Sequence, residues 1–250
     1  MNIYLMFFLI AIAAYLLGSI NFARILAWHS RRKDITKVGS GNPGTMNMLR
    51  SFGFLPALIT LILEVVKAGV CCLVTKIIVE HTQFPAYSEF AYYFAGLFAV
   101  IGSVFPIFYG FKGGKGLACF AGVLWFTPLW WVAFIVFLVF AILLYFYYYA
   151  FISTLSFITC MSASLTAWVF VEKIPFAWAI VVILWCLTAF IYLRHSGNFI
   201  RFVRHQENKS GFRKSIVKIF HRQKGVEEIP EEHVQQPPEK EIIIEDDQEN

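Results

Sequence analysis

The chain has 250 residues, of which 58% are apolar and 15% are charged, and its mean hydropathy is +0.65. This composition indicates a polytopic membrane protein and excludes an ordinary soluble domain. The formal net charge of +5 is unevenly distributed, because residues 1–225 hold 20 Lys/Arg and 6 Asp/Glu whereas residues 226–250 hold 10 acids and one lysine.

The first apolar run extends from Ile3 to Leu26. No basic residue precedes it, and basic residues gather at and after its end: Arg24, Arg31, Arg32, Lys33 and Lys37. A cleavable signal peptide would begin with a positive segment, so this run is expected to remain as the first membrane span, with the N-terminus outside. Residues 27–53 then form a loop on the inner side.

The second run, Phe54 to Val79, carries Glu64 and Lys67 three residues apart, which places both on one face of a helix. Ionisable side chains at that depth either face a cavity or form a structural ion couple, and the sequence leaves both interpretations open. Residues 80–88 are expected to form a short outer loop, followed by a third span from Glu89 to Tyr109.

Residues 117–171 form a run of 55 positions without a charged side chain. Because one span takes about 20 residues, this run holds more than one. Pro128 and the hydroxyl cluster at 153–156 are expected to mark turns at the membrane interface. The resulting spans are 117–128, 130–149 and 154–171.

Residues 175–193 form the last span, so the sequence predicts an all-α polytopic membrane protein with seven transmembrane helices, the N-terminus outside and the C-terminus cytoplasmic. The basic residues support this orientation. Eighteen of them fall in segments assigned to the inner side, and three do not: Lys67, Lys76 and Lys173.

The spans place one membrane domain in residues 1–200. Residues 201–225 alternate basic and apolar side chains, a pattern typical of an amphipathic segment on an anionic membrane surface. Residues 226–250 are rich in Glu, Pro and Gln and are predicted to be an acidic, disordered cytoplasmic tail. A nucleic-acid partner is not expected, since most of the chain is lipid-soluble.

A glycine-rich stretch, residues 38–50, lies in the first inner loop. Glycine lets a backbone turn sharply and approach a ligand closely, and successive N–H groups in such a turn form a nest for anions. An arginine adds a fork that suits phosphate oxygens. The residues predicted to bind an anionic substrate here are Ser40, Gly41, Asn42, Asn47 and Arg50.

A second glycine-rich turn, residues 110–116, places Lys112 and Lys115 among four glycines. It does not fit the P-loop pattern, because Gly116 stands where Ser or Thr would hold Mg²⁺, so nucleotide hydrolysis is not expected. A glycine-rich turn with Lys112 and Lys115 still suits a phosphate. The alternative is a basic loop that serves only topology.

Ser153 and His195 are the candidate hydroxyl and imidazole pair for proton transfer, and Asn198 shares a helical face with His195. The alternatives are a serine that packs or bonds within its helix and a histidine at the membrane interface. The five cysteines lie in apolar runs without metal-type spacing, and the sequence has no cluster of carboxylates, so neither a metal nor a cofactor is expected. In the predicted topology four polar clusters reach the same inner face: 39–50, 111–116, 150–156 and 194–207.

Over residues 16–207 the sequence resembles the bacterial PlsY family, the acyl-phosphate-dependent glycerol-3-phosphate acyltransferases. The resemblance rests on three motifs in order and on the Glu64-x-x-Lys67-x-Gly69 pattern. The motifs are Gly39-Ser40-Gly41-Asn42-Pro43-Gly44 with Asn47 and Arg50, then Val104-Phe105-Pro106 with residues 110–116, and Ser153 with His195-x-x-Asn198-x-x-Arg201 and Glu207.

Five positions depart from the family pattern, and each departure removes a donor, a charge or a small residue. Thr36 and Ala150 stand where the pattern has arginine. Met46 stands for threonine, Ser103 for histidine and His205 for glycine. These departures bear on turnover more than on the fold.

The resemblance implies transfer of a fatty acyl group from acyl phosphate to glycerol 3-phosphate, giving lysophosphatidate and phosphate, by a multi-pass protein of the cell membrane whose motifs face the cytoplasm. It implies catalytic roles for Ser153, His195 and Lys112. It implies substrate binding by Ser40, Gly41, Asn42, Asn47, Arg50, Gly113, Gly114, Lys115, Asn198 and Glu207. The enzyme that forms acyl phosphate is a candidate partner.

Two other classes of function stay open at this point. One is a membrane transporter or anion-binding protein, which Glu64 and Lys67 would suit. The other is a catalytically impaired scaffold of the same family, which the five departures permit.

Overall fold

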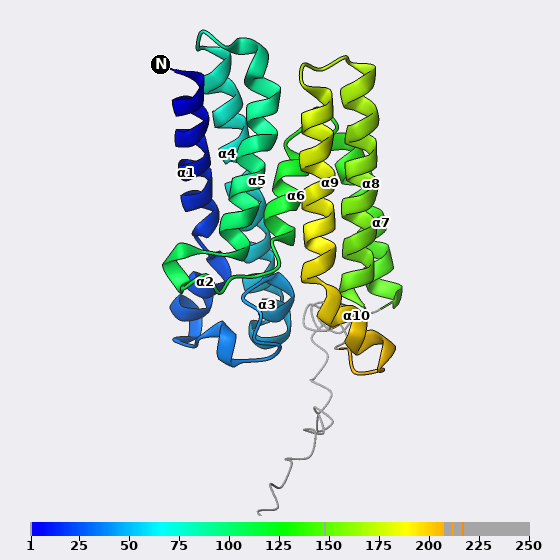
Figure 1. Ribbon diagram of the computed structural model, residues 1–250. Coiled ribbons are helices and arrows are strands. Elements are labelled where there is room, and N and C mark those ends of the chain that lie inside the picture. Colours follow the sequence, from blue (N-terminus) through cyan, green and yellow to red (C-terminus); the bar gives the residue numbers. More distant parts are fainter. Residues whose placement is uncertain (1, 148, 208–211, 213–216, 218–250) are drawn as a thin grey trace, which may run out of the picture.

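The computed structural model describes residues 2–147, 149–207, 212 and 217, and all regular structure among them is helical. The helices of the bundle run side by side in Figure 1, and all of them except α6 are long. They are α1 (Ile3–Ser19), α4 (Phe54–Glu80), α5 (Ser88–Val104), α6 (Leu117–Trp125), α7 (Trp130–Tyr147), α8 (Ala150–Val171) and α9 (Ala177–Arg194). Shorter helices gather at the end opposite the N-terminus: α2 (Phe22–Arg31), α3 (Thr45–Phe52) and α10 (Ser196–Val203). Single 3₁₀ turns occupy Ile35–Lys37, Pro85–Tyr87 and Ile107–Tyr109.

The predicted membrane class is confirmed, because five helical stretches are long and apolar enough to cross a bilayer. They are Ile3–Arg31, Phe54–Glu80, Pro85–Tyr109, Ala150–Val171 and Ala177–Arg194. Of the other two predicted spans, α7 is apolar but shorter, and α6 has only nine residues. Helix α6 is short because it starts after Gly116, which is left-handed at φ +78°, and ends just before Pro128.

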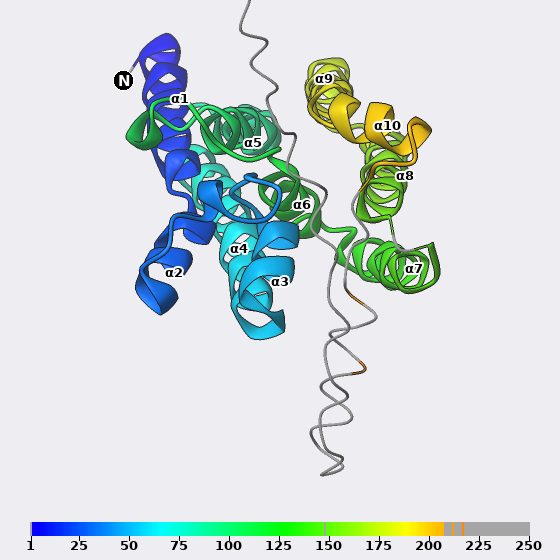
Figure 2. The same cartoon turned by 90° about the horizontal axis from the view of Figure 1, so that it is seen from below.

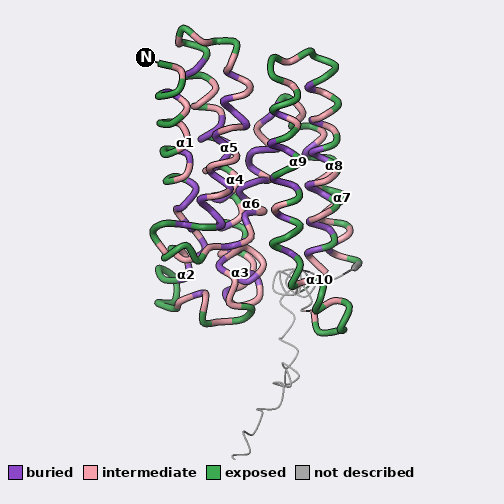
Figure 3. Tube along the Cα trace, in the orientation of Figure 1, coloured by how far each residue is buried: buried purple, intermediate pink, exposed green. Residues whose placement is uncertain are grey.

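The helices form two groups with α6 between them (Figure 2). Helices α1, α4 and α5 pack together, as do α7, α8 and α9, and α5 contacts α9 across the groups. Small residues allow the closest approaches: a Cβ on Gly18 would lie 2.1 Å from Ala99 O, and one on Gly122 would lie 2.1 Å from Val65 O. The buried residues accordingly follow the inner faces of these helices (Figure 3).

The predicted first span, Ile3 to Leu26, lies within the apolar stretch Ile3–Arg31, but its helix is interrupted. Helix α1 ends at Ser19 and α2 begins at Phe22. Asn21 causes the new start, since its Oδ1 accepts a hydrogen bond from the N–H of Arg24 at 2.9 Å, which is an N-cap.

The pair Glu64 and Lys67 on α4 satisfies the backbone groups that this break leaves free. Lys67 Nζ donates to the carbonyls of Gly18 at 3.2 Å and Ile20 at 2.6 Å, and to Glu64 Oε2 at 2.7 Å. Glu64 Oε1 accepts from the N–H of Phe22 at 2.9 Å. Helix ends in an apolar environment need such partners, so the structure supports the interpretation of this pair as a structural ion couple.

Two predicted loops are wrong in detail. Residues 27–53 hold the second half of α2 and all of α3. The hydroxyl cluster 153–156 is not a turn, because α8 already begins at Ala150. Hydroxyl groups are accommodated inside a helix when they bond to its own carbonyls, as Ser156 Oγ does to Ile152 O at 3.1 Å.

The predicted surface segment 201–225 falls mostly outside the described residues, and the predicted acidic tail 226–250 falls entirely outside them. The described start of the former is the end of α10. This helix exposes Phe199, Ile200 and Val203, which are apolar side chains of the kind that a membrane surface accepts.

Candidate functional site

The four polar clusters predicted to share a face do lie at one end of the bundle (Figure 1). They come from the loop before α3, the connection between α5 and α6, the first turns of α8, and the junction of α9 with α10. Segments far apart in the sequence therefore converge, as a binding site requires.

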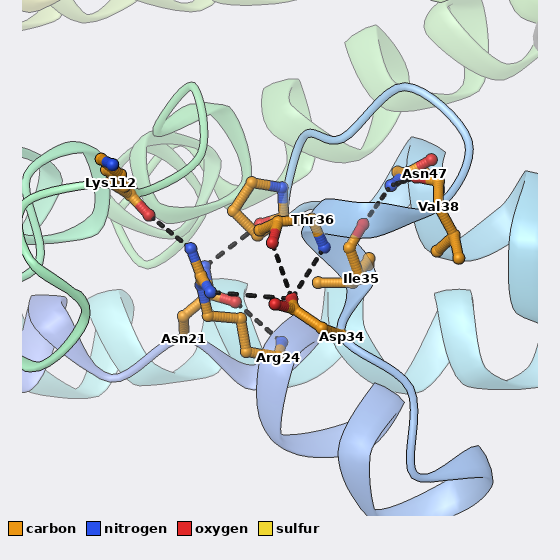
Figure 4. Close-up of polar contacts among 9 residues, drawn as sticks. Asn21, Arg24, Asp34, Ile35, Thr36, Val38, Asn47 and Lys112 are labelled. Carbon is orange, nitrogen blue, oxygen red and sulfur yellow. Dashed lines mark hydrogen bonds and ion pairs between the residues drawn. The ribbon is translucent and has the colours of Figure 1, made fainter.

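Asn47 organises the first glycine-rich loop from within. Its Oδ1 accepts a hydrogen bond from the N–H of Ser40 at 2.9 Å. Its Nδ2 donates to the carbonyls of Ile35 and Val38, each at 3.0 Å (Figure 4). Gly41 adopts φ +69°, in the left-handed region that favours glycine. Asn47 thus shapes the loop, and the side chain of Ser40 stays exposed.

The second glycine-rich loop lies against the first. The N–H groups of Gly113 and Gly114 donate to the carbonyls of Val104 at 3.2 Å and Ser103 at 3.3 Å. A Cβ on Gly113 would lie 2.3 Å from Ser103 O, so this position requires glycine, and one on Gly114 would lie 3.2 Å from Pro43 O in the first loop. Residue 103 holds the second loop through its backbone carbonyl.

Lys115 joins the second loop to α10. Its Nζ donates a hydrogen bond to Asn198 Oδ1. Asn198 Nδ2 donates to Glu207 Oε1 at 2.7 Å, and Arg201 Nε donates to Glu207 Oε2 at 2.9 Å. Burial lowers the pKa of Lys115 from 10.5 to about 8, against the opposing effect of the Glu207 carboxylate. Three predicted binding residues are therefore in one hydrogen-bonded chain.

Arg50 brings α3 to the same cluster. Burial lowers the pKa of its guanidinium, and the carboxylate of Glu207 opposes this shift. Its Nε is buried without a hydrogen-bond partner among the described residues. Arg50, Lys115, Arg194 and Arg201 act electrostatically on one another around Glu207, and this excess of positive charge suits an anion.

His195 is buried, with 6% of its surface exposed. Its Nδ1 lies 2.8 Å from the carbonyl of Ile191. A carbonyl only accepts, so Nδ1 carries the proton and Nε2 presents a lone pair. Burial lowers the pKa of His195 to about 4, and the charges of Lys115 and Arg194 act in the same direction. The imidazole is therefore neutral near pH 7.

Ser153 lies in the first turn of α8 and is 1% exposed. Its Oγ is buried and has no hydrogen-bond partner in the described part of the chain, so no hydrogen bond joins it to His195. An unpaired buried hydroxyl costs about 1–3 kcal/mol, which makes it a natural partner for a ligand. If Ser153 and His195 act together, as predicted from the sequence, a bound ligand must connect their side chains.

The remaining predicted residues are more peripheral, and two contributors were missed. The side chain of Lys112 is exposed and that of Asn42 is half-buried. Arg24 Nη2 donates to Lys112 O at 2.7 Å, and Arg194 Nη2 donates to Gly114 O at 3.3 Å. In the sequence both arginines look like ordinary topology charges. Only the position of Arg194, next to the candidate histidine, marks it out.

The sequence matches the family described as glycerol-3-phosphate acyltransferase over residues 8–205. The chain belongs to this family. Its glycerol-3-phosphate acyltransferase relatives include one from Francisella tularensis subsp. mediasiatica, 37% identical over 82% of this chain and 93% of the relative. Another, from Francisella philomiragia, is 35% identical over the same shares. These matches confirm the resemblance that the motifs indicate.

Two solved structures of PlsY, an integral membrane glycerol 3-phosphate acyltransferase, share the family fold. The glycerol 3-phosphate form superposes with a TM-score of 0.67 at 28% identity, covering 81% of this chain and 94% of that one. The lysophosphatidic acid form gives a TM-score of 0.66 at 27% identity, covering 85% of this chain and 98% of that one.

Proposed function

We propose that the chain transfers a fatty acyl group from acyl phosphate to glycerol 3-phosphate, as a membrane enzyme of phospholipid synthesis. The observation that carries this is the convergence of Arg50, Lys115, Arg194 and Arg201 on one end of a membrane bundle, beside two glycine-rich loops. Both substrates are phosphate esters or anhydrides, and such a cluster suits them. The relatives in the family bear the name of this activity.

In the proposed reaction the hydroxyl oxygen of glycerol 3-phosphate attacks the acyl carbonyl carbon directly. The new C–O ester bond forms, the C–O bond to phosphate breaks, and phosphate leaves with the electron pair. The hydroxyl proton passes to Nε2 of His195 or to the departing phosphate, and Ser153 orients the hydroxyl. Lys112 stabilises developing negative charge on the acyl phosphate.

The test is direct transfer by the purified full-length protein. Acyl phosphate and labelled glycerol 3-phosphate should give labelled lysophosphatidate, and Lys173→Ala, at the opposite end of the bundle, should not change the rate. A folded wild type without transfer would favour the impaired scaffold. Uptake of unmodified glycerol 3-phosphate into vesicles would favour a transporter.

The two side chains predicted for proton transfer are expected to act through the bound substrate. Ser153→Ala and His195→Ala should each lower kcat by about 10- to 100-fold, since positioned general bases contribute at least that much. The double variant should lose little more than either single variant, because the two would serve one proton transfer. Ser156→Ala, on the same helix but bonded to its own backbone, is the matched control. Fully additive losses would contradict a shared role.

The proposal includes seven spans, an outside N-terminus and a cytoplasmic site, supported by the charge asymmetry. Single cysteines at positions 83 and 174 should label with an impermeant thiol reagent in intact cells, in a background without the native cysteines. Cysteines at Lys33 and Phe108, both exposed at the site end, should label only after lysis. Labelling of either cysteine in intact cells would mean that the proposed membrane orientation is wrong.

A further inference from the structure

Arg24 lies where the two glycine-rich loops meet, and the proposed reaction gives it no role. Its backbone N–H is fixed by Asn21 Oδ1 at 2.9 Å, at the start of α2. Asn21 also donates from Nδ2 to the carbonyl of Pro43 at 3.1 Å. The first turn of α2 is thereby tied to the first glycine-rich loop, and the side chain of Arg24 extends from this fixed base (Figure 4).

The guanidinium of Arg24 reaches two segments at once. Its Nη2 donates to the carbonyl of Lys112 at 2.7 Å, and its Cζ lies 4.9 Å from the centre of the Tyr109 ring, a cation–π distance. Its Nη1 lies 3.9 Å from Asp34 Oδ1. Figure 4 shows the guanidinium between the Lys112 carbonyl and the Asp34 carboxylate. Arg24 therefore bridges the turn that leads into the first loop and the turn that opens the second.

Asp34 is itself held in place. Its Oδ1 accepts hydrogen bonds from the N–H of Thr36 at 2.9 Å and from the hydroxyl of Thr36 at 2.7 Å. These bonds lower the pKa of Asp34, and the charge of Arg24 adds to the effect. The guanidinium of Arg24 on α2 therefore reaches a turn that is already fixed.

We propose that Arg24 is a positioning residue that sets the separation of the two glycine-rich loops. This inference rests on the proposed function, since the separation matters when each loop serves one of two phosphate substrates. Loss of a residue that positions both loops raises the KM values for both substrates together. A residue that only stabilises the fold lowers the amount of active protein and leaves both KM values unchanged.

The kinetic test uses the full-length protein with Arg24→Gln. We expect the KM values for acyl phosphate and for glycerol 3-phosphate to rise together by about 10-fold or more, as for loss of a charged hydrogen bond. The exposed Lys33→Ala is the control and should leave both KM values unchanged. Unchanged KM values with a lower thermal stability in Arg24→Gln would overturn the positioning role.

A distance measurement tests the same inference without turnover. Spin labels at Lys37→Cys and Phe108→Cys report on the two turns, in a background with Cys160→Ser and Cys186→Ser because the other three cysteines are buried. The distance distribution should be narrow in the parent and wider in Arg24→Gln. An unchanged distribution in Arg24→Gln would overturn the proposal. If the wild type is inactive but its spin-label distance distribution still widens in Arg24→Gln, only the proposed function is overturned.

Discussion

Replacing Lys115 by methionine is expected to lower kcat/KM by about 30- to 1000-fold, the range for loss of a charged hydrogen bond in a desolvated site. Methionine keeps the length and removes the charge. Lys115 is half-buried, is bonded to Asn198 and lies near the charges of Arg50 and Arg194, so solvent replaces its charge only in part. Steady-state kinetics with acyl phosphate and glycerol 3-phosphate measure the loss.

The pH dependence of kcat/KM tests the same role of Lys115, because the direction of its pKa shift fixes the direction of the expected change. Burial brings the pKa of Lys115 to about 8, so the ammonium that binds an anion is present below that pH and is lost above it. In the wild type kcat/KM is expected to fall above about pH 8. Lys115→Arg, which stays charged, should be less active but should not show this fall. A fall of the same size in Lys115→Met would assign the titration to another group.

Lys112 serves as the comparison within the same loop. Its side chain is exposed, whereas that of Lys115 is half-buried. If Lys112 acts mainly as the transition state forms, Lys112→Ala should lower kcat with little change in KM. The exposed Lys33, also at the site end, should tolerate replacement by alanine. Equal effects in Lys112→Ala and Lys33→Ala would remove Lys112 from the catalytic group.

The membrane class and the shared end of the site were predictable because hydropathy and the distribution of basic residues are local properties of the sequence. The break after Ser19 was not, because a lone Asn21 cap in an apolar run does not show that the freed backbone groups have partners. Those partners, Glu64 and Lys67, lie more than 40 residues away. The sequence shows the pair but not its partners. Its two interpretations are therefore separated only by the structure.

The residues of the site also divide into those that the sequence predicts and those that it does not. Glycine-rich loops identify Gly113 and Lys115 from sequence alone, since only special backbone conformations demand such a pattern. Which of two nearby lysines is buried depends on how α10 packs, and periodicity does not report that. Arg24 and Arg194 were missed because each follows or ends an apolar run, where a basic residue already has a topological explanation.

Arg50→Ala is expected to raise the KM for one phosphate substrate by about 30- to 1000-fold, with a smaller change in kcat, because it deletes a bidentate donor set used in binding. Its unpaired Nε is the structural reason, since a bound phosphate would supply the missing acceptor. Arg50→Lys should remain poor, because an ammonium does not reproduce the planar fork.

The control for Arg50 lies beside the same helix. Arg31 Nη1 donates to the carbonyl of Ser51 on α3 at 3.3 Å, yet its side chain is exposed. Arg31→Ala removes an arginine and a contact to α3 without touching the buried cluster, so both KM values should stay near those of the wild type. If Arg50→Ala behaves like Arg31→Ala, the first glycine-rich loop does not bind through its arginine. If both raise KM equally, general attraction of anions explains the effect, and increasing the salt concentration should abolish it because only exposed charges are strongly screened.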